Sequence, residues 1–314
     1  MTYNFALIGC GGYVAPRHMK AIKATGNHLA AALDRGDSVG VLDSFSYDTA
    51  FFTEFERFDR HAEKLRRLGE DKRIHYVSIC SPNYLHDAHI RFALRIGADA
   101  VCEKPLVLNP WNLDALQEIE AETERKVYNI LQLRVHPSIL ELKKKIDGDG
   151  KQDKYHIDLS YITSRGRWYF VSWKGDASKS GGVATNIGIH FFDMLMWIFG
   201  KPLHHEVHLS EPEKMAGYIE LENARVRWFL SVDKGDLPEE VKKNGNPTYR
   251  SITVDGEEIE FSGGFTDLHT LVYQDILEGN GYGINAARSS LELVSDIRNK
   301  EVSIEDQSHL HPFV

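Results

Sequence analysis

The chain has 314 residues, more than one ordinary core needs and enough for two domains. Its formal net charge of -9 argues against nucleic acid as a partner, because phosphate binding needs a basic surface. Its three cysteines, Cys10, Cys80 and Cys102, fall in or just after apolar runs, as free thiols do in a reducing compartment. The longest apolar stretch, 191–199, is shorter than the ~20 residues of a bilayer span, and the N-terminus enters a strand pattern at once. We therefore expect a soluble, cytoplasmic protein.

Residues 1–134 alternate strand-like and helix-like segments, which predicts a parallel sheet covered by helices. Their strands are nearly continuous apolar runs, as is typical of strands buried on both faces. We expect strands at 4–9, 28–34, 76–81, 98–103 and 126–131, and helices at 16–25, 53–68, 85–96 and 110–124. This pattern predicts an α/β Rossmann domain over 1–134.

Residues 135–314 follow a different pattern, in which closely spaced strands and short turns predict an α+β domain with a mostly antiparallel open sheet. We expect strands at 154–164, 207–210, 216–221, 224–232, 251–254 and 257–261, and helices at 136–146, 186–199, 268–278 and 286–299. Gly200 and Pro202 follow the second of these helices in the usual order of helix stops.

A glycine-rich turn separates the first strand from the first helix and carries Gly9, Gly11, Gly12, Tyr13 and Val14. In a dinucleotide site such glycines let the backbone approach the pyrophosphate at a helix N-terminus. Val14 stands where the fingerprint usually has a third glycine or an alanine. The next strand ends in Asp34, where an acid binds the adenosine ribose and repels a 2′-phosphate. The cofactor we expect is therefore NAD.

Two further strands run straight into polar loops, at 81–86 and at Glu103-Lys104-Pro105. Ligands of open parallel sheets bind outside the carboxyl ends of the strands. Lys104 should therefore emerge at the cofactor crevice.

At these residues the sequence resembles the Gfo/Idh/MocA family of sugar and cyclitol oxidoreductases. The resemblance rests on the triplet 103–105 and on a second motif, Gly181-Gly182-x-x-x-Asn186-x-Gly188-x-His190-x-x-Asp193. Within the family, segments 12–19, 129–134 and 167–175 are similar to the UDP-N-acetylglucosaminuronate 3-dehydrogenases, which supply diamino sugars for bacterial O-antigen.

The resemblance implies NAD, oxidation of the sugar 3-hydroxyl to a ketone, and a homotetramer built through the open sheet of the second domain. In some members 2-oxoglutarate reoxidises the bound NADH. Many members have Asp where this chain has Asn186, and an amide cannot act as a base, so its role must be limited to hydrogen bonding. The residues expected to bind the cofactor are Gly9, Gly11, Gly12, Tyr13, Val14, Asp34, Ser81, Asn83, His86, Glu103, Lys104 and Gln132.

Oxidising an alcohol with NAD requires a group that takes the hydroxyl proton. Asn186, His190 and Asp193 share one face of a predicted helix, and packing of its apolar side should hold His190 rigidly. Lys104 is the second catalytic candidate, because partial burial and the positive pyridine ring both favour its neutral amine. His190 is the slightly better base, since the free imidazole pKa lies near about 6.5, but the two roles could be reversed.

The segment 165–180 carries Arg165, Arg167, Lys174 and Lys179 against a single acid, Asp176, in a chain that is negative overall. Arginines suit carboxylate and phosphate, and aromatic rings stack on sugars. An anionic nucleotide sugar fits this segment, although a solvated basic loop with its aromatics in a subunit interface is the alternative. The substrate-binding residues we expect are Lys104, Arg165, Arg167, Trp168, Tyr169, Trp173, Lys174, Asn186 and His190.

Other chemistries receive less support. The fifteen histidines form no convincing ligand set at metal spacing, and no serine or cysteine lies in a nucleophile elbow. Two rival functions stay open: a dehydrogenase of a free sugar or cyclitol, which would leave the positive segment unexplained, and a non-catalytic NAD(H) sensor, in which both Lys104 and His190 would be odd.

Overall fold

The computed structural model describes residues 2–259 and 267–314. The chain divides into two compact units, the first made of Met1–Gln132 and Thr266–Arg288, the second of Leu133–Phe265 and Ser289–Val314. The observed break lies close to the predicted one at residue 134. Residues 266–288, however, return to the first unit, which a single boundary between 1–134 and 135–314 does not allow for.

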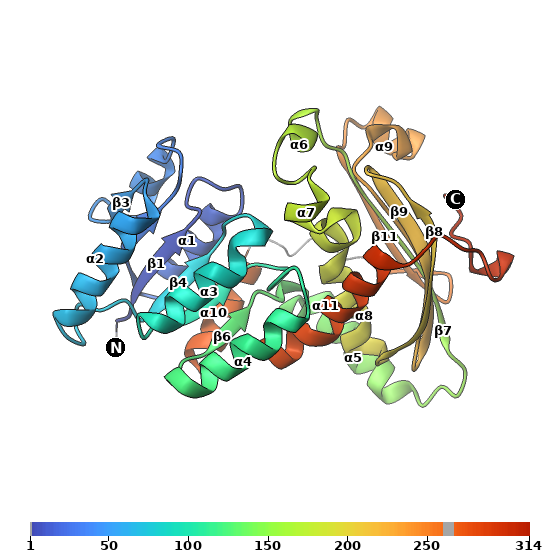
Figure 1. The fold of residues 1–314 in the computed structure, drawn as a ribbon. Helices are drawn as coiled ribbons and strands as arrows, with labels where there is room; N and C mark the ends of the chain where they lie inside the picture. Colours follow the sequence, from blue (N-terminus) through green and yellow to red (C-terminus); the bar gives the residue numbers. More distant parts are fainter. Residues whose placement is uncertain (1, 260–266) are drawn as a thin grey trace. The chain divides into compact units, whose positions relative to one another are not determined.

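The first unit is built on a six-stranded parallel sheet in the order β3-β2-β1-β4-β5-β6, the arrangement of a Rossmann domain (Figure 1). Its strands are β1 (Asn4–Ile8), β2 (His28–Leu33), β3 (Ala50–Phe52), β4 (Tyr76–Ile79), β5 (Asp99–Cys102) and β6 (Val127–Asn129). The apolar strand centres, such as Phe5, Leu7 and Val101, are fully buried, which confirms the predicted fold class of this unit.

Helices cover this sheet, and one of them comes from far along the chain. They are α1 (Ala15–Ala24), α2 (Phe55–Arg67), α3 (His86–Arg95), α4 (Trp111–Thr123) and α10 (Leu268–Leu277), with short 3₁₀ turns η1 (Gly40–Ser44) and η2 (Asn83–Leu85). The late helix α10 packs against α1, and its Tyr273 ring stacks 5.8 Å from that of Phe5. A C-terminal segment therefore completes the core of the N-terminal unit.

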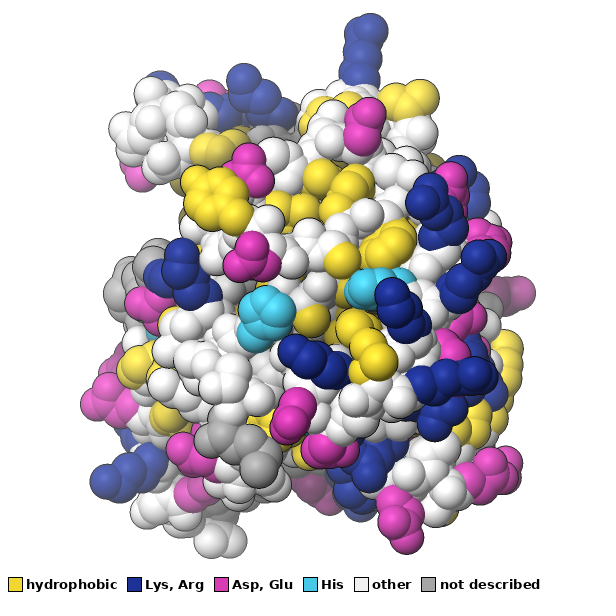
Figure 2. All heavy atoms as spheres, turned by 90° about the vertical axis from the view of Figure 1, so that its left-hand side faces the viewer, with side chains coloured by type: hydrophobic (Ala, Val, Ile, Leu, Met, Phe, Trp, Pro, Cys, Tyr) yellow, Lys and Arg dark blue, Asp and Glu magenta, His cyan; other side chains and the backbone are white. Residues whose placement is uncertain are grey.

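The surface around α2 carries charges of both signs. Glu63 accepts hydrogen bonds from Arg66 and Arg67, and Asp59 from Arg95. Figure 2 likewise shows acidic and basic side chains next to one another over much of one face of the molecule. These exposed pairs offset each other's charge locally and contribute little to stability.

The second unit is built on a mixed sheet in the order β12-β11-β7-β10-β9-β8. Its strands are β7 (Tyr155–Thr163), β8 (Pro202–Ser210), β9 (Lys214–Leu221), β10 (Ala224–Ser231), β11 (Thr248–Val254) and β12 (Glu257–Glu258). Strands β7 and β10 run parallel, whereas the other neighbours are antiparallel, so the predicted mostly antiparallel sheet is confirmed. The predicted strand 257–261 lies partly outside the described residues.

The remaining helical segments belong to this unit, except that η3 and α11 each begin in the first unit and continue into the second. They are η3 (Gln132–Val135), α5 (Pro137–Asp149), α6 (Trp168–Val171), α7 (Ala177–Ser180), the π-helical η4 (Ala184–Gly188), α8 (Ile189–Phe199), η5 (Lys234–Asp236), α9 (Glu239–Lys243), α11 (Ile284–Asn299) and η6 (Gln307–His309).

Helix α8 lies along one face of this sheet (Figure 1). Its Phe192 ring contacts Trp228 of β10 at 5.3 Å between centroids. The segment Ala177–Phe199, which ends with α8, is long and apolar enough to cross a membrane by length and composition alone, but 72% of its most apolar window is buried in the protein. That degree of burial is typical of a core helix.

Candidate cofactor and substrate site

The glycine-rich turn brings the ends of β1 and β4 together. Gly9 adopts a φ of +87°, and a Cβ there would lie 2.7 Å from the backbone of Cys80, so no other residue fits. The N–H of Gly9 donates to the carbonyl of Leu33, and that of Gly12 donates to Gly9. The turn then leads into α1 through Val14. This is the backbone shape that a pyrophosphate needs at a helix N-terminus.

Asp34 lies beside this turn, at the end of β2. Its Oδ2 accepts from the N–H of Gly11 at 2.9 Å, and its Oδ1 from Gly36 at 3.0 Å. Burial, followed by the Asp34 charge, raises the pKa of the neighbouring Cys10 thiol to about 12, so this thiol is neutral. Asp34 is thus an oriented carboxylate next to the glycine turn, as a ribose ligand should be.

The loops after β4 and β5 are joined through His86. One ring nitrogen lies 2.8 Å from the carbonyl oxygen of Ser81, and the other lies 2.7 Å from that of Pro105. Burial lowers the pKa of His86, whereas the two carbonyl oxygens and Glu103 act in the opposite direction. The Ser81 hydroxyl in turn bonds to His89. His86 therefore fixes the loop that carries Lys104 against the loop that carries Asn83.

Glu103 turns its side chain into the protein. His18 and His269 each lie with Nε2 3.0 Å from its Oε1, and the backbone N–H of Lys104 donates to its Oε2 at 3.3 Å. Burial opposes ionisation, but the hydrogen bonds from the two histidines hold the pKa of Glu103 well below its usual range. Its predicted contact with the cofactor stays a prediction.

Gln132 and Tyr13 are two other residues predicted to contact the cofactor. The Oε1 atom of Gln132 is buried without a hydrogen-bond partner among the described residues, and a buried amide oxygen normally has one. Tyr13 is 86% exposed, and its ring lies under the guanidinium of Arg17, 5.6 Å away. With the glycine turn and Asp34, these groups fit a dinucleotide.

In the second unit, the structure gives the motif 181–193 its local geometry. Gly181 has a φ of +82°, and a Cβ there would lie 2.6 Å from the Cβ of Thr185, so glycine is required. The chain then forms the π-helical segment η4, a form often found at functional sites. Here the Asn186 amide donates to the Tyr169 hydroxyl at 2.8 Å, which brings two predicted substrate residues together.

His190 and Asp193 lie on α8 and have different surroundings. His190 is half-buried, with its ring centroid 6.0 Å from Tyr161 and 4.2 Å from Phe191. Asp193 is 3% exposed and forms a two-bond ion pair with Arg134, at 2.7 and 2.9 Å. Burial raises the pKa of Asp193, and Arg134 counteracts it. The Asp193 carboxylate is thus paired with Arg134 and has a structural role on α8.

The basic segment 165–180 exposes part of its charge. Arg165, Arg167 and Trp168 are exposed, whereas Tyr169 is buried and reaches Asn186. The Lys174 ammonium lies over the Trp173 ring at 4.1 Å. Lys179 is paired with Asp176 at 3.0 Å, so it adds little to the positive surface.

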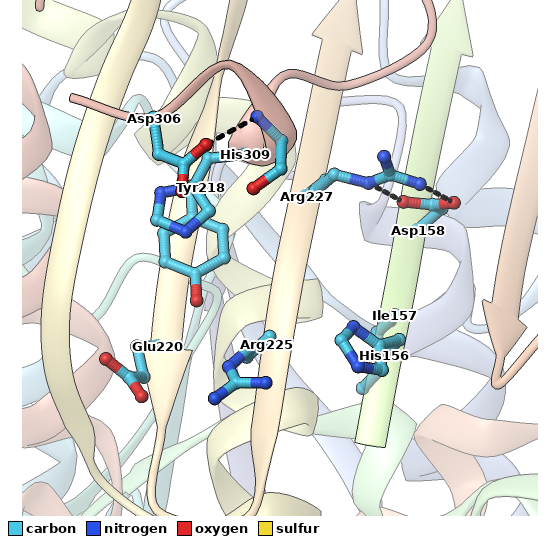
Figure 3. A pocket seen from close by; sticks show the side chains of 10 residues that line it. His156, Ile157, Asp158, Tyr218, Glu220, Arg225, Arg227, Asp306 and His309 are labelled. Carbon is cyan, nitrogen blue, oxygen red and sulfur yellow. Dashed lines mark hydrogen bonds and ion pairs between the residues drawn. The ribbon is translucent and has the colours of Figure 1, made fainter. Parts of the chain in front are cut away.

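A hollow of about 680 Å³ lies elsewhere, on the open face of the second sheet (Figure 3). Its lining residues are His156, Ile157, Asp158, Tyr218, Glu220, Arg225, Arg227, Asp306, Ser308 and His309. Arg227 forms a two-bond pair with Asp158, and the rings of Tyr218 and His309 stack at 3.7 Å. The sequence analysis did not single out this region. Its signal is the alternation of Arg225 and Arg227 with buried Val226 and Trp228.

Lys104 belongs to the first unit and His190 to the second, so their convergence on one substrate stays a prediction. The sequence analysis also missed the roles of His18, His269 and Tyr273 around Glu103. His18 lies in the quoted segment 12–19, but nothing local links it to a helix that begins at residue 268.

Comparison with known proteins agrees with this geometry. Residues 3–130 match the family model of the Gfo/Idh/MocA oxidoreductases, NAD-binding Rossmann fold, and residues 143–242 match its C-terminal alpha/beta domain. The chain belongs to the Gfo/Idh/MocA family: it is an oxidoreductase with an NAD-binding Rossmann domain followed by an α/β domain.

Among solved structures, it is similar to the WlbA (WbpB) dehydrogenase from Thermus thermophilus in complex with NAD and alpha-ketoglutarate. The identity is 52%, the TM-score is 0.95, and both chains are covered completely. A structure of that dehydrogenase with NAD and UDP-GlcNAcA matches at 51% identity, with the same TM-score and coverage. The WlbA dehydrogenase from Bordetella pertussis, at 18% identity over 95% of each chain and a TM-score of 0.76, shows the fold alone.

Curated relatives are more distant. Inositol 2-dehydrogenase from Rhizobium meliloti is 26% identical over 64% of this chain, and the putative oxidoreductase YteT from Bacillus subtilis is 31% identical over 40% of it. The matched stretches span 56% and 30% of the lengths of these two relatives.

Proposed function

We propose that the protein oxidises the 3-hydroxyl of UDP-N-acetylglucosaminuronic acid to the 3-keto sugar with NAD, as a step toward diamino-uronates for O-antigen. One observation supports this proposal most strongly. The chain matches, over its whole length and at 51% identity, a dehydrogenase that was crystallised with NAD and UDP-GlcNAcA. We also propose that the reaction takes place in the cytoplasm.

The first unit supplies the cofactor site. The turn with Gly9, Gly11 and Gly12 holds the pyrophosphate, and Asp34 binds the adenosine ribose. The loop residues Ser81, Asn83 and His86, together with the amide of Gln132, line the remainder. When bound there, NAD supplies the acceptor for the hydride that leaves the sugar carbon.

Lys104 and His190 take up the hydroxyl proton in this proposal, and either could be the base. Asn186 only hydrogen-bonds, because its amide cannot accept a proton and already donates to Tyr169. The positive segment binds the anionic parts of the substrate. Arg165 and Arg167 suit the diphosphate and the uronate, and Trp168 and Trp173 suit the face of a ring.

Two finer points belong to the same proposal. The relative crystallised with alpha-ketoglutarate supports 2-oxoglutarate as the compound that reoxidises NADH. A homotetramer would form through the open face of the second sheet. That face carries Arg227, Asp158 and Tyr218 around a hollow, and interfaces of this kind are enriched in arginine and tyrosine.

The test is to incubate the purified protein with NAD and UDP-N-acetylglucosaminuronic acid and to analyse the sugar by mass spectrometry. We expect a product two mass units lighter, and a loss of roughly 100-fold or more in kcat for Lys104→Met and His190→Asn, because each removes a proton-transfer group. Unchanged activity in both variants would remove these residues from the mechanism. Reduction of NAD by a neutral polyol alone would support the cyclitol dehydrogenase, and no turnover with any substrate would support the sensor.

A further inference from the structure

Five buried polar side chains form a continuous hydrogen-bonded chain inside the first unit. They are Ser78 on β4, Tyr273 and His269 on α10, His18 on α1, and Glu103 after β5. Their exposed fractions are 0%, 1%, 5%, 0% and 8%. Buried polar groups are costly unless each finds a partner, so a cluster of this size needs an explanation.

The distances define the order of the hydrogen bonds in this series. The Ser78 hydroxyl lies 2.6 Å from the Tyr273 hydroxyl, which lies 2.7 Å from Nδ1 of His18. Nε2 of His18 and Nε2 of His269 both lie 3.0 Å from the same oxygen of Glu103. The other oxygen accepts from the backbone N–H of Lys104. The chain therefore ends at the residue that precedes the proposed catalytic lysine.

The donor and the acceptor in each hydrogen bond can be assigned by starting from the Glu103 carboxylate. An ionised carboxylate only accepts, so both imidazoles carry their proton on Nε2. Nδ1 of His18 must then accept from the Tyr273 hydroxyl, which in turn accepts from Ser78. Burial lowers the pKa of His18, which agrees with a neutral ring. Each hydrogen bond in the series then has one donor and one acceptor, and Glu103 carries the negative charge.

Other ionisable groups around Glu103 leave this charge in place. Burial raises the pKa of Cys80 and Cys102 well above the usual range of a thiol, so both are neutral. Burial lowers the pKa of His86. Arg17 acts on the cluster from α1 but is exposed to solvent, which screens its charge. Lys104 is the cationic side chain next in sequence to this anion.

We propose that His18, His269 and Tyr273 hold Glu103 as a buried anion that orients Lys104 and sets its proton affinity during sugar oxidation. These three are positioning residues, and the inference rests on the proposed function. A fixed negative charge beside Lys104 favours its ammonium form and opposes the positive pyridine ring. Two imidazoles and one carboxylate could also ligate a metal, since their ligand atoms lie within 4.8 Å of one another. Because each hydrogen bond in the series has an assigned donor and acceptor, the structure favours a hydrogen-bonded anion over a metal site.

The kinetic test compares four variants of the full chain by the pH profile of kcat/KM for the sugar. Glu103→Gln removes the charge, and His269→Leu removes one of its donors. Glu103→Gln should move the acidic limb to lower pH by roughly one unit or more, because a unit charge within about 12 Å at an effective dielectric constant of about 20 has at least this magnitude. His269→Leu should move the limb in the same direction, to the extent that Glu103 takes up a proton after losing this donor. In His269→Gln an amide N–H can replace the imidazole donor, so kcat/KM should stay within about threefold of the original. His61→Leu is the matched control for losing a histidine in this unit and should leave the profile unchanged.

Nitrogen NMR of histidine-labelled protein, recorded without substrate, provides the second readout. His18 should appear as a neutral Nε2–H tautomer near pH 7, Nε2 of His269 should also carry a proton, and metal analysis should find no stoichiometric ion. An unmoved limb in Glu103→Gln, an imidazolium at His18, an unprotonated Nε2 at His269, or one zinc per chain overturns the proposal. If the unsubstituted protein has these protonation states but does not oxidise the sugar, the proposed function is wrong and the buried anion stands.

Discussion

At the scale of single residues, Asp34 gives the clearest test of cofactor choice. Its carboxylate is oriented by the N–H groups of Gly11 and Gly36, and its charge should repel a 2′-phosphate. Asp34→Asn keeps a hydrogen-bonding side chain and removes the charge. We expect kcat/KM with NAD to fall by roughly tenfold or more, the value of one charged hydrogen bond, and kcat/KM with NADP to rise. Steady-state kinetics with both cofactors measures the ratio.

The control for this change is Asp37→Asn, since Asp37 is an exposed acid in the same loop. It should leave the ratio of the two kcat/KM values unchanged. If Asp34→Asn also leaves that ratio where it was, the carboxylate does not select the cofactor.

Local sequence predicts where Gly9 and Asp34 lie, because a glycine at the end of one strand and an acid at the end of the next form a recognisable pattern. It predicts the surroundings of Glu103 poorly. The partners of that carboxylate lie 85 and 166 positions away, and no local pattern joins α1, β5 and α10. The same holds for Asp193, whose spacing on one face with His190 gave no sign of its pairing with Arg134.

At the scale of elements, the long periodic helices of the first unit agree with prediction, whereas one of its short strands does not. The predicted helices 53–68 and 110–124 correspond to α2 and α4 within two residues. Strand β3 has three residues, too few for a recognisable pattern, and was missed. The predicted helix 186–199 begins in a π-helical segment, because the geometry around Gly181 and Thr185 depends on packing rather than on propensity.

Two histidines of the C-terminal segment, His309 and His311, contact the second sheet. His311 should make the stability of the fold sensitive to acid. His311 lies 3.1 Å from the hydroxyl of Ser160, and burial lowers its pKa to about 4. A histidine that is neutral when folded and titrates near about 6.5 when unfolded stabilises the fold fully above that pH. This stability is lost as the pH falls toward 4. Between pH 7 and pH 5 the loss should be about 2 kcal/mol.

Urea unfolding, followed by tryptophan fluorescence at pH 7 and pH 5, measures this loss. His311→Gln removes the titrating ring and should flatten the pH dependence of the unfolding midpoint. His28→Gln is the control, because His28 is an exposed histidine. An equally steep dependence in His311→Gln would show that other groups cause it.

At the scale of the whole molecule, the division into units bears on any attempt to isolate the cofactor half. Helix α10 buries Leu268, Val272, Tyr273 and Ile276 in the first unit. At about 1.5–3 kcal/mol for each large buried side chain, their loss is comparable to the ~5–15 kcal/mol that stabilises an ordinary domain. A fragment of residues 1–134 should therefore fail to fold cooperatively or to bind NAD.

Joining 1–134 to 267–288 through a flexible Gly/Ser linker of about 12 residues should restore both properties. Thermal unfolding followed by circular dichroism, and NADH fluorescence, compare the two fragments. A soluble, NAD-binding 1–134 fragment would contradict this expectation.

Because residues 266–288 belong to the first unit, they also limit how domains of this protein can be exchanged with those of relatives. A gene segment that ends near codon 134 encodes a nucleotide-binding half without the helix that carries Tyr273 and His269. Exchanging that half for one from a distant relative would pair a foreign sheet with a native α10, and the contacts around Phe5 and Glu103 would no longer match. Exchanging the whole nucleotide-binding unit needs three crossover points, near residues 132, 266 and 288, because residues 289–314 belong to the second unit again.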